Sequence, residues 1–138
     1  MSCILRIGGL DVAIDRLVAQ TALKPYRVDH KGRRKSATRV HEWSAAHYLV
    51  SDRDFDDLRG QVSDAVMFLE ANAAEVAALV AFPGVQEPVL NFGINGAAGV
   101  LNDWIPAQLA KLAGGLGLAI ELSHYPVGES AAYGVADA

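Results

Sequence analysis

Two spacings of apolar residues alternate along the first half of the chain, and each predicts a different element. A nearly continuous apolar run at 3–7 predicts a buried strand, and alternating polarity over 26–30 predicts a half-buried one. A second extended run covers 39–50. Apolar residues take helical spacing at 12–18 and again at 55–69. The predicted order is therefore strand, helix, strand, strand and long helix.

Polar residues mark where these helices begin and end. Asp11 is expected to cap the first helix, because a carboxylate there can accept the free amides of the first turn. Ser51 or Asp52 is expected to cap the long helix. The segment Asn72 to Glu75 resembles a capping box, with Asn in the place of Ser or Thr. A break at this point, followed by a shorter helix, is therefore predicted.

The second half of the chain predicts three further strands, a turn and a helix. An apolar strand at 89–94 runs into Asn95-Gly96, the strongest hairpin-turn dipeptide in the chain. The turn predicts a weaker return strand at 98–101. Asp103 is expected to cap the next helix, which glycines end, and a last alternating strand covers 118–123.

Helices alternate with strand pairs in this order, which predicts an α+β sandwich. The expected sheet is mixed or antiparallel, and the helices pack mainly on one of its faces. Its first part matches the split βαβ arrangement called ferredoxin-like. Residues 1–126 form one predicted domain, and 127–138, which have little to bury, form a loose or partner-docked tail.

Charge is distributed unevenly along the chain. Seven of the twelve basic residues lie between Lys24 and Arg39, with Asp29 as the only acid among them. That segment carries +6, so the remainder carries −10 of the net charge of −4. A concentration of positive charge of this kind can attract an anionic partner. The stretch Arg33 to Thr38 is expected to be an exposed loop.

This segment is the predicted contact surface of the protein. Its members are six cations and one neighbouring aromatic residue: Arg27, Lys31, Arg33, Arg34, Lys35, Arg39 and Trp43. The favoured function is non-enzymatic binding of a protein partner, in an immunity-like or regulatory role. The alternative without a binding function is a solvated hairpin tip that keeps a sheet edge soluble.

Three further functions stay open. The same loop can bind nucleic acid, with Tyr26, Trp43 and Tyr48 near in sequence for base stacking, although the acidic net charge disfavours this. An enzyme or binding domain for a small anion requires Arg27, His30 and His41 to converge in one concave pocket. Pairing of an exposed strand edge predicts a homodimer.

Other chemistry is not predicted. Four histidines lack compact metal-ligand spacing, so no metal is expected. Cys3 lies in a predicted core strand and is expected to be a buried structural thiol. The acids from Asp52 to Asp57 are explained by a helix start, and no G-x-S-x-G motif is present. We therefore predict no catalytic residue and no cofactor.

The chain shows neither a signal peptide nor an apolar run near the ~20 residues that a spanning helix requires. A cytoplasmic location without membrane association is therefore expected.

Several packing and turn segments resemble the small bacterial family called domain of unknown function 4279. The matching segments lie within residues 3–126: Leu5-Arg6-Ile7-Gly8-Gly9-Leu10, Leu23-Lys24-Pro25-Tyr26-Arg27, Lys31-Gly32, Trp43 and Leu109 to Glu121. The resemblance permits an immunity-type role. It assigns no catalytic residue.

Overall fold

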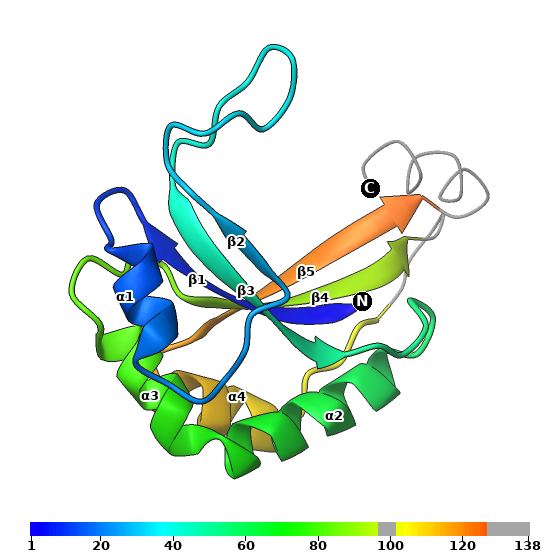
Figure 1. Cartoon of the computed structure of the whole chain (residues 1–138). Helices are drawn as coiled ribbons and strands as arrows, with labels where there is room; N and C mark the ends of the chain where they lie inside the picture. The colour runs from blue at the N-terminus through cyan, green and yellow to red at the C-terminus, as the bar shows by residue number, and fades with distance from the viewer. Residues whose placement is uncertain (97–101, 127–138) are drawn as a thin grey trace.

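A computed structural model describes residues 1–96 and 102–126 of the chain. These residues form a five-stranded sheet and four helices in an α+β arrangement (Figure 1). The elements, in order, are β1 (Cys3–Gly9), α1 (Ile14–Ala19), β2 (Arg27–Asp29), β3 (Ser44–Ser51), α2 (Leu58–Ala71), α3 (Ala73–Ala81), β4 (Val89–Gly96), α4 (Ala107–Gly115) and β5 (Ala119–Pro126). The predicted tail at 127–138 lies outside the described residues.

The sheet is mixed, as predicted, with the strand order β2-β3-β1-β4-β5. Strand β1 lies in the centre and pairs antiparallel with β3 and with β4. Strand β2 pairs antiparallel with β3 at one edge, and β5 pairs parallel with β4 at the other. The five-stranded order is not that of the four-stranded ferredoxin-like sheet to which the sequence pointed.

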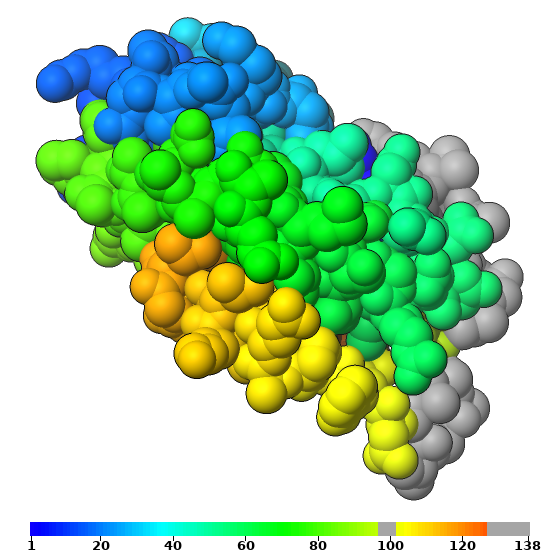
Figure 2. All heavy atoms as spheres, turned by 90° about the horizontal axis from the view of Figure 1, so that it is seen from below, coloured from blue at the N-terminus to red at the C-terminus, as the bar shows by residue number. Residues whose placement is uncertain are grey.

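All four helices lie on one side of the sheet, and they cover that face when seen from below (Figures 1 and 2). Alternate residues of the strands point toward them, because successive side chains of a strand face opposite ways. Leu5, Tyr48, Leu90 and Phe92 are almost completely buried there. Cys3 is also buried on this face, as predicted, and burial raises the pKa of its thiol.

The expected hairpin turn at Asn95-Gly96 is wrong. Strand β4 continues through both residues, which pair with Tyr125 and Pro126 of β5. Pairing along a whole neighbouring strand outweighs the local preference of the dipeptide for a turn. The predicted return strand at 98–101 lies outside the described residues.

Three predicted helix caps are also wrong. Asp103 does not cap α4, which begins at Ala107 with Pro106 as its N-cap residue. Helix α1 begins at Ile14, three residues after Asp11, and its N-cap residue Ala13 has no side-chain cap. Helix α2 begins at Leu58, where the Asp57 carboxylate accepts a hydrogen bond of 2.8 Å from Gly60 N. Ser51 instead ends β3. A turn in which Asp57 N donates to Asp54 O separates the end of β3 from the start of α2.

The predicted break near Asn72 is confirmed, although no capping box forms. Asn72 separates α2 from α3, and its Nδ2 donates to the carbonyl of Phe68 at 2.9 Å. Within the described ranges, no helix is both long and apolar enough to cross a membrane.

Candidate functional site

Residues 31–43, which contain most of the basic segment, form a hairpin that we call the arm (Lys31–Trp43). Gly32 N donates to His41 O at 2.8 Å, and His41 N donates to Arg33 O at 2.9 Å. Near the tip, Lys35 N donates to Arg39 O at 2.9 Å. The arm extends beyond the sheet between β2 and β3 (Figure 1). Residues 33–38 are exposed and lie outside every helix and strand, so the expected exposed loop is confirmed, and backbone hydrogen bonds close the arm around it.

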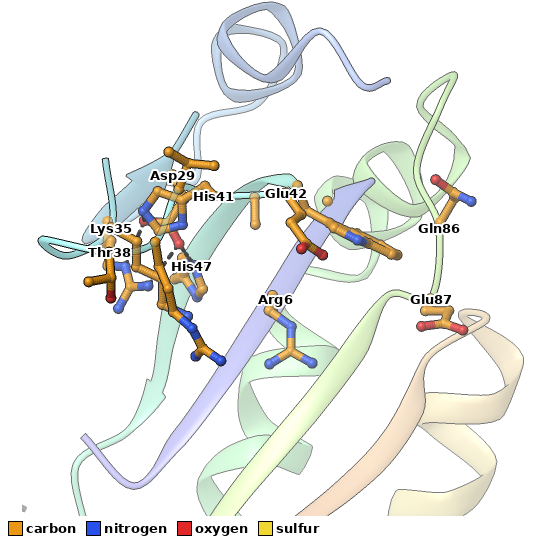
Figure 3. A pocket seen from close by; sticks show the side chains of 15 residues that line it. Arg6, Asp29, Lys35, Thr38, His41, Glu42, His47, Gln86 and Glu87 are labelled. Atoms are coloured by element: carbon orange, nitrogen blue, oxygen red, sulfur yellow. Dashed lines mark hydrogen bonds and ion pairs between the residues drawn. The ribbon is translucent and has the colours of Figure 1, made fainter. Parts of the chain in front are cut away.

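A cavity of about 760 Å³ lies between the arm and the helix-free face of the sheet. Arg6 and Gly8 of β1 line it, together with residues of β2 and β3. The backbone of β3 leaves no room for a side chain at Gly8, because a Cβ atom there would collide with the carbonyl of Ser44. Gln86 and Glu87, which precede β4, close the opposite side (Figure 3).

The structure divides the predicted contact surface into two sets. Arg27, Lys35, Arg39 and Trp43 line the cavity. The three other members, Lys31, Arg33 and Arg34, do not line it and are exposed on the arm. About half of the residues predicted as one contact surface therefore line the cavity.

The predicted small-anion set of Arg27, His30 and His41 does not converge. Arg27 and His41 line the cavity, but His30 does not, and its Nε2 lies 3.0 Å from the carboxylate of Asp15 in α1. The alternation of β2 places His30 on the other side of the strand from Asp29. That prediction is therefore wrong for His30.

Asp29 is the centre of the polar network in the cavity. Arg27 donates to both of its carboxylate oxygens, at 2.9 and 2.8 Å, and His47 Nε2 lies 2.9 Å away. His41 Nε2 lies 3.6 Å from the same carboxylate. Burial acts to raise the pKa of Asp29, but the hydrogen bonds from Arg27 and His47 outweigh burial and hold that pKa at about 2.

His47 lies beneath the cavity in β3 with its side chain only 8% exposed. Burial lowers its pKa, although the hydrogen bond to Asp29 acts in the opposite direction. The neutral imidazole must carry its proton on Nε2 to donate to Asp29, because an ionised carboxylate only accepts. Its Nδ1 is buried and has no hydrogen-bond partner within the part of the chain that the structure describes.

Sequence reasoning missed the pairing of Asp29 with His47. Arg27 and Asp29 are two residues apart in β2, so their side chains share one face, and His47 lies directly opposite Arg27 in β3. The hairpin register would have brought these residues together. The register was not fixed by the sequence, because the long arm between the strands allows several.

The aromatic residues proposed for base stacking also separate. Trp43 lines the cavity. Tyr26 is exposed, with its ring centroid 6.1 Å from that of His47, and Tyr48 is buried beneath the helices. Only Trp43 is thus placed to contact a ligand in the cavity.

The cavity contains both signs of charge in similar numbers. Its cations are Arg6, Arg27, Lys35 and Arg39, and its acids are Asp29, Glu42 and Glu87. No group of three or more His, Cys, Asp or Glu side chains within 1–96 and 102–126 is placed to hold a metal ion. The arrangement is suited to hydrogen bonds and ion pairs with a polar ligand.

No protein-family model, curated protein or solved structure matches this chain. The functional interpretation therefore depends on the geometry of the arm and the cavity.

Proposed function

We propose that this protein is a non-enzymatic cytoplasmic binding module whose arm and cavity receive a short anionic segment of a partner protein. The observation that carries the proposal is that the charged groups of Lys35 and Arg39 lie at the cavity without an ion-pair partner among the described residues. Both line the cavity, and neither forms an ion pair with another described residue. Ammonium and guanidinium groups in this state are available to a carboxylate or phosphate of a partner.

The network around Asp29 supports binding in preference to acid–base catalysis. A carboxylate with a pKa of about 2 is a weak base near neutral pH, and both its oxygens already accept hydrogen bonds. The same contacts hold Arg27 in the cavity wall and bring His41, at the base of the arm, close to β2. Asp29 therefore orders the binding surface.

The charge of the whole chain favours a short protein segment over nucleic acid. Outside Lys24 to Arg39 the chain carries −10, so a long polyanion leaving the arm would meet a negative surface. A short acidic segment ends before it reaches that surface. A second copy of this chain is one source of such a segment, which would make the protein a homodimer.

We also propose two finer assignments of fold and family. The order β2-β3-β1-β4 supports a ferredoxin-like unit, to which α4 and β5 are added. For the family, we propose domain of unknown function 4279. The first segment that resembles this family, Leu5 to Leu10, contains residues with clear packing roles. Leu5 and Ile7 are buried, and a Cβ atom on Gly9 would collide with the carbonyl of Gly84. An immunity-like or regulatory role is consistent with a binding module of this kind.

Fluorescence anisotropy with two labelled probes tests the proposed function. One probe is a peptide of glutamate and glycine, and the other is a single-stranded oligonucleotide. The Lys35→Ala/Arg39→Ala variant removes two cations from the cavity but keeps the backbone hydrogen bonds of the arm tip. The matched control is Arg33→Ala/Arg34→Ala, which removes two arm cations outside the cavity.

We expect the wild type to bind the peptide, and the cavity variant to lose about tenfold or more in affinity while the control keeps most of it. Equal losses in both variants would show that only general positive charge matters. Tighter binding of the oligonucleotide, with affinity falling steeply as salt rises, would favour the nucleic-acid alternative. If the wild type binds neither probe, the proposed function is wrong.

A further inference from the structure

The two sides of the cavity differ in chemistry. Lys35 and Thr38 lie on the side of the arm, near β2 and β3, whereas Gln86 and Glu87 lie across the cavity from them (Figure 3). Glu42 also lines the cavity. One side is thus rich in cations, and the other presents a carboxylate.

Glu42 and Glu87 are as free of ion-pair partners as Lys35 and Arg39 are. Neither carboxylate lies within ion-pair distance of a cation of the described chain. Asp29, in contrast, is neutralised by Arg27. The carboxylates that face the ligand space are therefore those of Glu42 and Glu87.

The segment that carries Glu87 is fixed to the end of β1. Gln86 N donates to Gly8 O at 2.8 Å, and the side-chain Oε1 of Gln86 accepts from Leu10 N at 3.0 Å. Two hydrogen bonds thus hold the acidic side of the cavity at a set position relative to Arg6 on β1. This geometry limits how a ligand can reach both sides.

Trp43 adds an aromatic surface beside Glu42. It follows Glu42 directly in the arm and lines the same cavity. An indole ring and carboxylates together form a favourable setting for a guanidinium or ammonium group, which is attracted by the ring face and by the negative charge.

The balance of charge favours a partner segment that carries a cation in addition to its anionic group. Once the ion pairs Arg27–Asp29 and Arg6–Glu121 are set aside, Lys35 and Arg39 remain with Glu42 and Glu87, so two cations stand against two acids. A ligand that is anionic throughout would be attracted by one side and repelled by the other. A ligand with both charges gains on each side.

We infer that the cavity recognises a dipolar peptide segment, in which an acidic side chain meets Lys35 and Arg39 while an arginine or lysine meets Glu42, Glu87 and Trp43. This inference rests on the proposed function, since it specifies the sequence character of the partner segment that the cavity receives.

Calorimetric titration with three peptides of equal length tests the inference that the cavity recognises a dipolar segment. The first contains two glutamates, a short glycine spacer and two arginines, the second has glutamine in place of both arginines, and the third has glutamine in place of both glutamates. Glycine spacers of several lengths are compared, because the ligand must span the cavity. The proteins are the wild type, Glu42→Gln/Glu87→Gln, and Glu70→Gln/Glu75→Gln, which makes the same change in charge on α2 and α3.

We expect the wild type to bind the dipolar peptide at least about tenfold more tightly than the peptide without arginine, for at least one spacer length. The Glu42→Gln/Glu87→Gln variant should lose this preference and still bind the peptide that keeps only glutamates. The control variant should keep the preference.

Equal wild-type affinity for the first two peptides would overturn the inference and leave the proposed function in place. A preference that persists in Glu42→Gln/Glu87→Gln would also overturn it, because the cation would then be recognised elsewhere. Tightest binding of the peptide without glutamates, or binding of none of the three, would overturn both proposals.

Discussion

The two faces of one sheet perform different tasks in this protein. On the face beneath the helices, Leu5, Tyr48 and Phe92 are almost fully buried in an apolar core. On the opposite face, their strand neighbours Arg6 and His47 line a polar cavity. Because the side chains of a strand alternate, adjacent residues of β1 and β3 belong to the core and to the candidate site in turn.

The comparison teaches that stability and binding are separated by one position along the strand. A core residue contributes by removing apolar surface from water, so truncating it leaves a void. A residue of the open face remains in contact with water and contributes little to folding unless it is part of a network. Asp29 and His47 belong to such a network and should therefore behave in an intermediate way.

The sharpest test compares two adjacent residues of β1. Leu5→Ala should lower the free energy of unfolding by about 2–5 kcal/mol, because Leu5 is completely buried. Arg6→Ala should cost less than about 1 kcal/mol, since its ion pair with Glu121 at 3.6 Å is solvent-exposed. Urea unfolding followed by circular dichroism measures both. Similar losses would show that the two faces are not energetically distinct.

Asp29→Asn tests the network on the open face. It should lower the free energy of unfolding by about 2 kcal/mol at neutral pH, because Arg27 and His47 lose a charged acceptor. Asp15→Asn, which alters the exposed partner of His30, is the matched control and should cost less. A loss for Asp29→Asn no larger than that of the control would mean that the network adds no stability.

The lowered pKa of Asp29 leads us to expect that the free energy of unfolding decreases at acidic pH. Its folded-state pKa of about 2 lies below the ordinary value of 3.8, so the unfolded chain takes up this proton first. The contribution is present above pH 3.8 and is lost as the pH falls toward 2. Acid unfolding in this range should be shallower for Asp29→Asn than for the wild type. Identical acid profiles would contradict the role assigned to Asp29.

The lowered pKa of His47 leads us to expect a second change in the free energy of unfolding, at a higher pH. Burial lowers its pKa below the ordinary 6.5, so the unfolded state binds a proton more readily than the folded state does. Stability should therefore decrease as the pH falls below 6.5. His47→Gln keeps an N–H that can donate to Asp29 but has no titration, and its stability should vary less over this range. The free energy of unfolding in urea, measured at several pH values, distinguishes the two slopes, and equal slopes would contradict the prediction.

The smallest expected effect concerns the backbone of Glu87. Its φ of 50° is a left-handed conformation, which a non-glycine residue adopts at a cost. Glu87→Gly should be more stable than Glu87→Ala by about 1 kcal/mol, because glycine removes the Cβ atom that makes this conformation unfavourable. Thermal unfolding of the two variants measures the cost of the left-handed backbone conformation alone, since both variants lack the carboxylate. A more stable alanine variant would show that no such strain exists.

Much of the fold was accessible from the sequence because periodicity reports burial directly. The apolar strands near Ile7 and Leu90 were predicted, and so was the break at Asn72. The predicted start of α2 was wrong because several acidic residues precede this helix, and in the structure it is the carboxylate of Asp57 that caps it. Asn95 and Gly96 were read as a turn, since β5 lies far along the chain and its pairing is not visible locally.

The candidate site was predicted only in part, for a related reason. Composition located the arm, but it grouped Lys35 and Arg39 with cations that do not reach the cavity. Glu87 lies far from the arm in sequence and enters the site only through the hydrogen bonds of Gln86 to the end of β1.

The sequence by itself determined which residues are buried, where most elements lie and where positive charge gathers, because these follow from local periodicity and composition. The tertiary structure alone decided that Asp29 and His47 meet, and that Glu42 and Glu87 line the same cavity as Lys35 and Arg39. Those contacts depend on strand register and on which strands are neighbours, and both are set by packing of the whole chain.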